Sequence, residues 1–223
     1  EVHELYYELW GNPDGVPFVF VHGGPGAGFD PSDYRFFDAE KHHVLFYDQR
    51  GSGKSKPYCD LTENTTQYLV DDQKVLMDEF GFNTAIIFGG SWGSTLGLCF
   101  AIAYPGMVEG MVLRGIFLSE GWDREYYTGG GTELFFPEAY RRLISHVPVG
   151  EDVLDYYAAK IQSDDEEIRH KYAYEWVRYE CTLLDKGFSE SELDAFVMET
   201  PIESFALMEC HYLGHNCFLS DQY

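Results

Sequence analysis

The sequence has little positive charge: 15 Lys and Arg residues stand against 38 Asp and Glu residues, which gives a formal net charge of −23. Nucleic acids and anionic membranes are bound through clustered basic side chains, so neither is expected as a partner. There is also no run of eighteen apolar residues and no recognisable signal peptide. We therefore expect no transmembrane helix and no secretion.

Cysteine is scarce and irregularly spaced. The five cysteines are odd in number and form no C-x-x-C pair, so we expect reduced thiols in a cytoplasmic protein. The H-E-x-x-H pattern of zinc peptidases is missing, and Gly53-Lys54-Ser55 lacks the first glycine of a phosphate-binding loop because Asp48 occupies that position. No metal and no cofactor is expected. Asp48 and Arg50 are interpreted as residues that hydrogen-bond neighbouring loops.

The most informative stretch is a glycine-rich turn between two apolar segments. Residues 85–88 are typical of a buried strand, and residues 92–104 of a helix that ends before Pro105. Between them Gly89, Ser91 and Gly93 fit G-x-S-x-G, which in strand-turn-helix context is a nucleophile elbow. A glycine-rich turn with an incidental serine is the alternative, and the flanking elements favour the elbow.

A second glycine-rich turn follows the apolar run 17–21, at His22 to Gly26 (HGGPG). In α/β-hydrolases the loop after this strand supplies one oxyanion-hole N–H, and the residue after the nucleophile supplies the other. Those donors are here the backbone N–H groups of Gly24 and Trp92. We interpret His22 as a residue that orders the loop, because the triad base comes last in this fold's chain order.

The order of elements indicates an α/β fold. Apolar runs at 17–21, 44–47, 85–88 and 108–117, with a loosely alternating stretch at 2–10, are predicted strands, and 65–80 is a predicted helix. Strands that alternate with helices predict a mostly parallel sheet. After Leu118 helical patterns replace the short apolar runs, with capping boxes at Ser163–Glu166 and Ser189–Glu192. Residues 1–118 are thus a predicted core and residues 119–223 an all-helical cap domain.

Four motifs in this order resemble one family. His22–Gly26, Asp48–Ser55, Gly89–Ser94 and Leu113–Leu118 are together similar to proline iminopeptidases, which are serine peptidases of the α/β-hydrolase fold. The resemblance implies release of N-terminal proline from short peptides through an acyl-enzyme on Ser91. It also implies that Glu180 and Glu209, in segments similar to the family's amine-binding ones, bind the substrate's amino terminus.

The residues around these glutamates agree with that role. Trp176 and Glu180 are four positions apart, as are Phe205 and Glu209, so each carboxylate shares a helix face with an aromatic ring. A carboxylate beside an aromatic face suits a proline ring with a protonated secondary amine. The alternative is that both are ordinary surface glutamates, since Glu is seldom buried unless it is paired.

The sequence departs from the family pattern at its end. The acid and histidine of this fold follow its last strands, but the sequence stops at Tyr223, where the cap ends. None of the eight histidines matches the catalytic position. We therefore expect the two closing strands, the acid and the base to be missing, and this fragment to be inactive or nearly so.

Two other functions stay open. The same fold carries esterases, amidases and acyltransferases, although a neutral ester gains nothing from two convergent carboxylates. A non-catalytic binding protein with an α/β-hydrolase fold would explain the missing acid and base. Hydrolysis of a proline amide with a free and with a blocked amine separates these alternatives.

Overall fold

The computed structural model describes residues 2–184 and 187–219. The chain folds into two compact units. The first holds the residues up to Leu118 together with Phe218 and Leu219, and the second holds Ser119–Cys217. Each unit has a hydrophobic core of its own.

The first unit is built around one five-stranded sheet with the strand order β1-β3-β2-β4-β5. The strands are β1 (Tyr7–Gly11), β2 (Val16–Val21), β3 (His42–Tyr47), β4 (Ala85–Gly90) and β5 (Val108–Arg114). Its helical segments are η1 (Pro31–Phe36), α1 (Thr66–Glu79), α2 (Trp92–Ala103) and η2 (Pro105–Met107). The predicted α/β-hydrolase fold is confirmed, although two predicted strands are too long. In the stretch 2–10 the strand begins only at Tyr7, and in the stretch 108–117 it ends at Arg114.

The direction of the strands decides where a site can form. β2 is parallel to β3 and to β4, and β4 is parallel to β5, while β1 runs antiparallel to β3. The carboxyl ends of four strands therefore meet at one edge of the sheet. His22, Asp48, Ser91 and Gly115 follow directly after those ends. In open α/β sheets this is the edge at which ligands bind.

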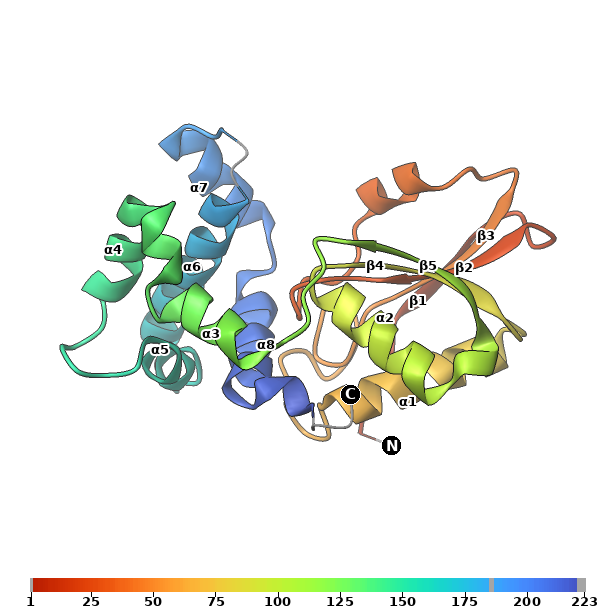
Figure 1. Cartoon of the computed structure of the whole chain (residues 1–223), viewed down its shortest axis with the longest axis horizontal. Coiled ribbons are helices and arrows are strands. Elements are labelled where there is room, and N and C mark those ends of the chain that lie inside the picture. The colour runs from red at the N-terminus through yellow and green to blue at the C-terminus, as the bar shows by residue number, and fades with distance from the viewer. Residues whose placement is uncertain (1, 185–186, 220–223) are drawn as a thin grey trace. The chain divides into compact units, whose positions relative to one another are not determined.

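The two faces of the sheet are covered differently. α1 and α2 lie along one face (Figure 1), where side chains such as Leu69, Met77 and Leu96 are buried. On the other face Phe20, Val44 and Phe46 are the buried centre of an aromatic cluster. The central strands are apolar in continuous runs because both of their faces are covered.

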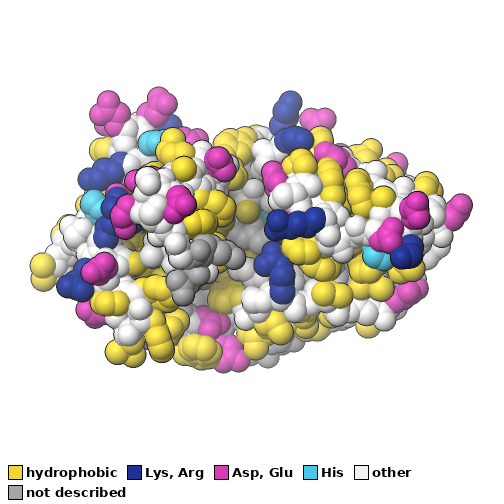
Figure 2. Space-filling view, turned by 90° about the horizontal axis from the view of Figure 1, so that it is seen from above, with side chains coloured by type: hydrophobic (Ala, Val, Ile, Leu, Met, Phe, Trp, Pro, Cys, Tyr) yellow, Lys and Arg dark blue, Asp and Glu magenta, His cyan; other side chains and the backbone are white. Residues whose placement is uncertain are grey.

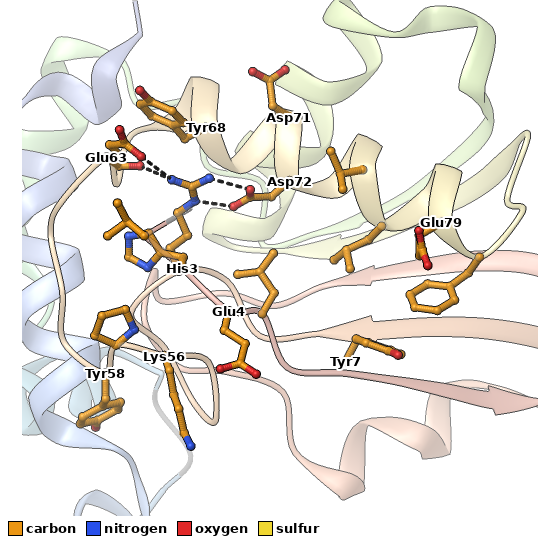
Figure 3. Close-up of a pocket in the computed structure, with 17 residues that line it drawn as sticks. His3, Glu4, Tyr7, Lys56, Tyr58, Glu63, Tyr68, Asp71, Asp72 and Glu79 are labelled. Atoms are coloured by element: carbon orange, nitrogen blue, oxygen red, sulfur yellow. Dashed lines mark hydrogen bonds and ion pairs between the residues drawn. The ribbon is translucent and has the colours of Figure 1, made fainter.

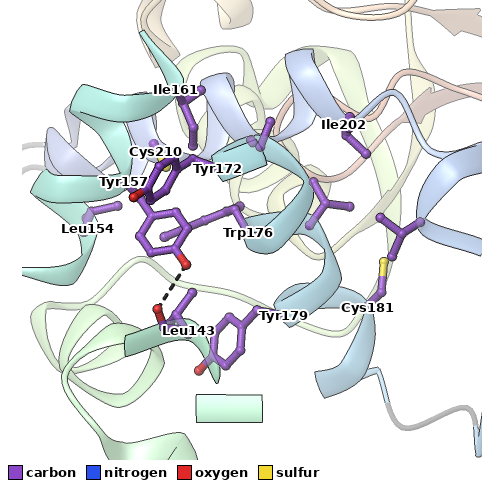
Figure 4. Packing of buried hydrophobic residues seen from close by; sticks show 14 of the residues in the cluster. Leu143, Leu154, Tyr157, Ile161, Tyr172, Trp176, Tyr179, Cys181, Ile202 and Cys210 are labelled. Carbon is purple, nitrogen blue, oxygen red and sulfur yellow. Dashed lines mark hydrogen bonds between the residues drawn. The ribbon is translucent and has the colours of Figure 1, made fainter. Parts of the chain in front are cut away.

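The second unit is helical throughout the described part of Ser119–Cys217. Its helices are α3 (Gly121–Thr128), η3 (Gly131–Leu134), α4 (Pro137–Ser145), α5 (Val153–Ile161), α6 (Glu166–Leu183), α7 (Glu190–Glu199) and α8 (Ile202–Gly214); η4 (Asn216–Phe218) follows. α6 packs against α5 and α8 around Trp176 and Tyr157, both fully buried (Figure 4). The Tyr157 hydroxyl donates to the Leu143 carbonyl at 3.0 Å, which connects α5 to α4.

Of the two predicted capping boxes, one is confirmed and one is wrong. The capping box of Ser189 and Glu192 at the start of α7 is confirmed. The box at Ser163 is wrong, because α6 begins two residues later and Asp165 is its cap. The Asp165 carboxylate accepts hydrogen bonds from two backbone N–H groups of the first turn, whereas the Ser163 hydroxyl accepts only the N–H of Asp165.

The surface reflects the excess of acid. On the face seen in Figure 2, acidic side chains are scattered among basic and apolar ones and are not gathered into one patch. Among the described residues no helix combines the length and apolar character needed to cross a bilayer.

Candidate active site

Ser91 stands alone in the turn between β4 and α2. Its backbone has φ 53° and ψ −124°, a conformation that is strained for a residue with a side chain. The side chain is exposed, and its hydroxyl has no hydrogen-bond partner among the described residues. The backbone of Ser91 is fixed to the neighbouring strand, because its N–H donates to the Arg114 carbonyl of β5 at 3.0 Å. This is the geometry expected of a nucleophile elbow.

The glycines of the motif allow the elbow to form. A Cβ on Gly89 would lie 2.2 Å from the carbonyl oxygen of Gly93, and a Cβ on Gly93 would lie 2.1 Å from that of Val21. Neither oxygen can move away, because both belong to the backbone of regular elements. α2 thus starts in direct contact with β2 and β4, and only glycine fits at these two positions.

Gly93→Ala is therefore expected to lower the free energy of unfolding by about 1–3 kcal/mol, the usual cost of overpacking. Gly106→Ala is the matched control, since a Cβ there would meet nothing within 4 Å. Urea unfolding followed by circular dichroism measures both variants. Equal midpoints for the two would contradict the close approach of α2 to β2.

The turn after β2 lies next to the elbow. A Cβ on Gly23 would be only 3.5 Å from the Ser91 Cβ. Gly24 has φ 108°, and a Cβ there would meet the backbone nitrogen of Gly26 at 2.7 Å. Trp92 is the first residue of α2, where backbone N–H groups point out of the helix end. Both predicted oxyanion donors thus belong to segments that border Ser91.

His22 orders this turn, as predicted. Its Nε2 accepts the backbone N–H of Gln49 at 2.9 Å, so the proton of the neutral ring is on Nδ1. Nδ1 lies 2.9 Å from the Gly23 carbonyl and donates to it. Burial lowers the pKa of the His22 imidazole, against the opposing effect of the nearby Asp48 carboxylate. The ring is therefore a neutral hydrogen-bonding bridge with no lone pair left for catalysis.

Gln49 has a part that the sequence analysis missed. It is 2% exposed, and its side chain joins the His22 carbonyl to the Trp92 indole through two hydrogen bonds of 2.9 Å each. The available signal was its position, two residues after the end of β3 at the carboxyl edge of the sheet. No local pattern pointed to its partners.

The turn 48–55 has the structural role that was predicted. The Asp48 carboxylate accepts the backbone N–H groups of Phe29 and Lys54 at 2.9 and 2.7 Å. The Arg50 guanidinium makes two hydrogen bonds to the Asp72 carboxylate and stacks over the Tyr68 ring. The turn thus connects the loops that follow β2 and β3 to each other and to α1.

A cavity of the first unit lies between the N-terminal segment and α1 (Figure 3). The Arg50–Asp72 ion pair forms part of its wall. The lining also includes His3, Tyr7 and Tyr58. None of the residues predicted to act in catalysis or binding lines it, so we do not assign the reaction to this cavity.

None of the first unit's described histidines is hydrogen-bonded to Ser91. These histidines are His3, His22, His42 and His43. His42 and His43 begin β3, at the end of the strand opposite the elbow. The Nε2 of His3 lies 2.6 Å from the Thr62 carbonyl. A histidine base for Ser91 is therefore not found among the described residues of this unit.

The second unit contains a pair of carboxylates between α6 and α8, of which Glu209 is buried and Glu180 is partly buried. The Trp176 indole N–H donates to Glu209 at 2.7 Å, and Glu209 is 6% exposed. The Tyr127 hydroxyl of α3 donates to Glu180, which lies one turn after Trp176 on α6. Trp176 was expected beside Glu180 on one helix, whereas its indole bonds across to the other carboxylate. The support from Tyr127 was not foreseen.

The ionised forms of Glu180 and Glu209 are disfavoured where they lie. Burial raises the pKa of Glu180, and burial together with repulsion from Glu180 raises the pKa of Glu209 well above its ordinary value. Among the described residues no Lys, Arg or His forms an ion pair with either carboxylate. Buried carboxylates are normally paired with a cation, so this arrangement suits a cation that comes from outside.

The residues of the two units have distinct chemical capacities. The elbow offers an exposed hydroxyl beside backbone donors, which suits attack on a carbonyl carbon. The carboxylate pair lies among aromatic rings of the second unit, including Tyr127 and Trp176, which suits an apolar cation. The roles of Ser91, Gly24, Trp92, Glu180 and Glu209 themselves stay predictions.

Comparison with known proteins agrees with this chemistry. The model of the alpha/beta hydrolase fold family matches residues 16–177. A proline iminopeptidase of Arabidopsis thaliana is 39% identical over 98% of this chain and 58% of its own length. A probable proline iminopeptidase of Leptolyngbya boryana is 38% identical over 97% of this chain and 68% of its own length. A proline iminopeptidase of Xylella fastidiosa is 39% identical over 97% of this chain and 70% of its own length. The chain thus spans a little over half of the Arabidopsis relative.

Solved structures share the fold at low identity. A crystal structure of a proline iminopeptidase from Mycobacterium smegmatis matches with a TM-score of 0.52 and 20% identity over 78% of this chain and 64% of the other. A structure from work on epoxide hydrolases in metagenomes of hot environments has a TM-score of 0.57 and 16% identity over 94% and 65%. At these identities the likeness shows the α/β-hydrolase fold and no particular reaction.

Proposed function

Because the chain belongs to the proline iminopeptidase family of α/β-hydrolases, we propose that it is the nucleophile- and amine-binding part of a serine exopeptidase that releases N-terminal proline from short peptides. The observation that carries the proposal is the pair of the partly buried Glu180 and the buried Glu209, which has no basic partner among the described residues. A peptide's protonated N-terminal proline supplies the missing cation and an apolar ring.

In the proposed reaction the Ser91 hydroxyl attacks the carbonyl carbon of the first residue. The backbone N–H groups of Gly24 and Trp92 donate to the oxygen as it gains negative charge. The peptide C–N bond then breaks, the amine leaves with a proton, and an ester to Ser91 remains. Water hydrolyses this ester, releases proline and restores the hydroxyl.

The attack needs a base that takes the serine proton and returns it to the leaving amine. No histidine of the first unit serves, for the reasons given above. We propose that the base and its acid partner come from the part of the relatives' length that this chain does not span. The predicted inactivity of the 223-residue chain by itself stays a prediction.

We also propose a cytoplasmic location. All five cysteines lie in the described part of the chain, and no disulfide joins them. Reduced, mostly buried thiols are typical of a reducing compartment.

The test compares two substrates in the protein at its natural length. We expect L-proline p-nitroanilide to be hydrolysed with a kcat/KM at least about 30-fold higher than N-acetyl-L-proline p-nitroanilide, because a buried charge left unpaired costs about 2–5 kcal/mol. The blocked substrate keeps the ring and the scissile bond but loses the cation. Equal rates for both would favour an esterase or amidase, and no turnover of either would favour a binding protein.

A further inference from the structure

We propose that Gln49 is a positioning residue of the oxyanion hole, which holds the turn after β2 and the start of α2 in one fixed relation. The inference rests on the proposed role of Ser91 as nucleophile. Gln49 touches no substrate in this proposal; it acts on the two segments that carry the backbone donors Gly24 and Trp92.

The two donor segments are not held together by the sheet. The last paired residues of β2 and β4 are Val21 and Gly89. Beyond this pair β2 and β4 are no longer paired with each other, and β4 stays paired only with β5, as far as Gly90 and Arg114. Both donors lie further along the chain than these last pairs. The relative position of Gly24 and Trp92 therefore depends on contacts outside the sheet.

Gln49 supplies such contacts from a third strand end. Its carboxamide nitrogen donates to the His22 carbonyl, and its carboxamide oxygen accepts the indole N–H of Trp92, each at 2.9 Å. Its backbone N–H donates to the imidazole of His22. One buried residue thus makes two hydrogen bonds to the turn after β2 and one to the first residue of α2.

The direction of each bond is fixed by chemistry. An indole N–H can only donate and a backbone carbonyl can only accept, so the carboxamide has one satisfactory orientation. Turning it over would set two donors against each other at Trp92 and two acceptors at His22. Such a link has a single geometry, which is what precise placement of oxyanion donors needs, since a misplacement of about 1 Å costs up to about 100-fold in rate.

The chain offers a matched control in Gln73, which is also a buried glutamine of the first unit. It is 0% exposed and lies on α1, where its carbonyl oxygen accepts the Tyr47 hydroxyl at 3.2 Å. Among the described residues its side chain has no hydrogen bond to either donor segment. Replacing it with methionine changes the same chemical group at a similar depth and leaves the oxyanion hole alone.

The experiment compares Gln49→Met, Trp92→Phe and Gln73→Met in the protein at its natural length. Two substrates are used: L-proline p-nitroanilide and p-nitrophenyl acetate, whose hydrolysis needs the oxyanion hole but no amine site. We expect Gln49→Met and Trp92→Phe to lower kcat about 10- to 100-fold for both substrates, less than the loss of a whole donor, with KM within about 3-fold. Gln73→Met should keep kcat.

The kcat of a double variant distinguishes a positioning role of Gln49 from a merely structural one. If Gln49 and Trp92 act through their shared hydrogen bond, Gln49→Met with Trp92→Phe should be little slower than the worse single variant. Multiplied losses would overturn the proposal, as would a Gln49→Met protein that unfolds earlier but keeps kcat. If Gln49→Met does not fold, Trp92→Phe alone decides, because an unchanged kcat there contradicts the link.

Failure of the proposed function gives a different result. A protein that ignores the proline amide but hydrolyses the acetate ester, more slowly in both variants, would refute the substrate and support Gln49. A protein in which the variants slow neither reaction would refute Gln49 alone.

Discussion

Ser91→Ala is expected to lower kcat for proline p-nitroanilide about 10⁴-fold or more in the protein at its natural length, with little change in KM. The variant loses the attacking oxygen but keeps the backbone donors and the amine site, so binding survives and chemistry fails. Ser91 is exposed in the elbow, and alanine in its place fills no new space. The loss is therefore chemical and not a failure to fold.

Labelling with a fluorophosphonate measures the same prediction directly. Intact mass should show one label on the protein that keeps Ser91 and no label on the Ser91→Ala variant. Ser32→Ala, at another exposed serine of the first unit, serves as control and should label normally. A Ser91→Ala protein that keeps a tenth of the activity would rule out Ser91 as the nucleophile.

Glu209→Gln is expected to have opposite effects on activity and stability. It should lower kcat/KM for the proline amide about 100-fold, because half of the cation's partners are lost. It should also raise the free energy of unfolding by about 1–3 kcal/mol, because it removes a buried charge that repels Glu180. The amide oxygen of glutamine can still accept the Trp176 indole N–H. Steady-state kinetics and urea unfolding measure the two effects.

The sign of the pH dependence follows from the raised pKa values. Between the ordinary glutamate value of 4.5 and the raised value of the pair, the native state holds more protons than the unfolded state. The free energy of unfolding therefore falls as pH rises through this window, and Glu209→Gln should flatten that slope. Substrate affinity changes the other way, since protonated carboxyls do not pair with an ammonium group, and KM should rise as pH falls through the window.

Glu175→Gln is the matched control on the same helix. Burial acts to raise the pKa of Glu175, but the hydrogen bonds to Arg142 outweigh it and the pKa is lowered. Neutralising this residue removes an ion pair, so it should destabilise the fold slightly and leave kcat/KM unchanged. If Glu175→Gln and Glu209→Gln shift the free energy of unfolding in the same direction, the inference that Glu180 and Glu209 repel each other is wrong.

The fold could be predicted from sequence because its signals are local. Apolar runs such as 17–21 and 85–88 mark central strands by composition alone, and G-x-S-x-G around Ser91 needs only its own flanks. The role of His22 as a loop-ordering residue was predicted from the chain order of the fold, in which the catalytic histidine comes last. Where signals competed within a few residues, as between Ser163 and Asp165 at the start of α6, the prediction failed.

The supports of the site could not be predicted in this way. Gln49 reaches His22 and Trp92, which are 27 and 43 positions away, and only the strand order brings the three together. In the second unit, Tyr127 meets Glu180 across 53 positions. The raised pKa values depend on this packing and on the closeness of two carboxylates from different helices, which no spacing along one helix reports.

The elbow also has a consequence for how this scaffold can change in evolution. Gly89 and Gly93 are held by backbone atoms about 2 Å from where a side chain would begin, so they cannot drift without damage to the sheet. Ser91 carries no such constraint, because its side chain points away from the packing and is exposed. A different reacting side chain can thus stand at this one position while the packing of the frame around it stays unchanged.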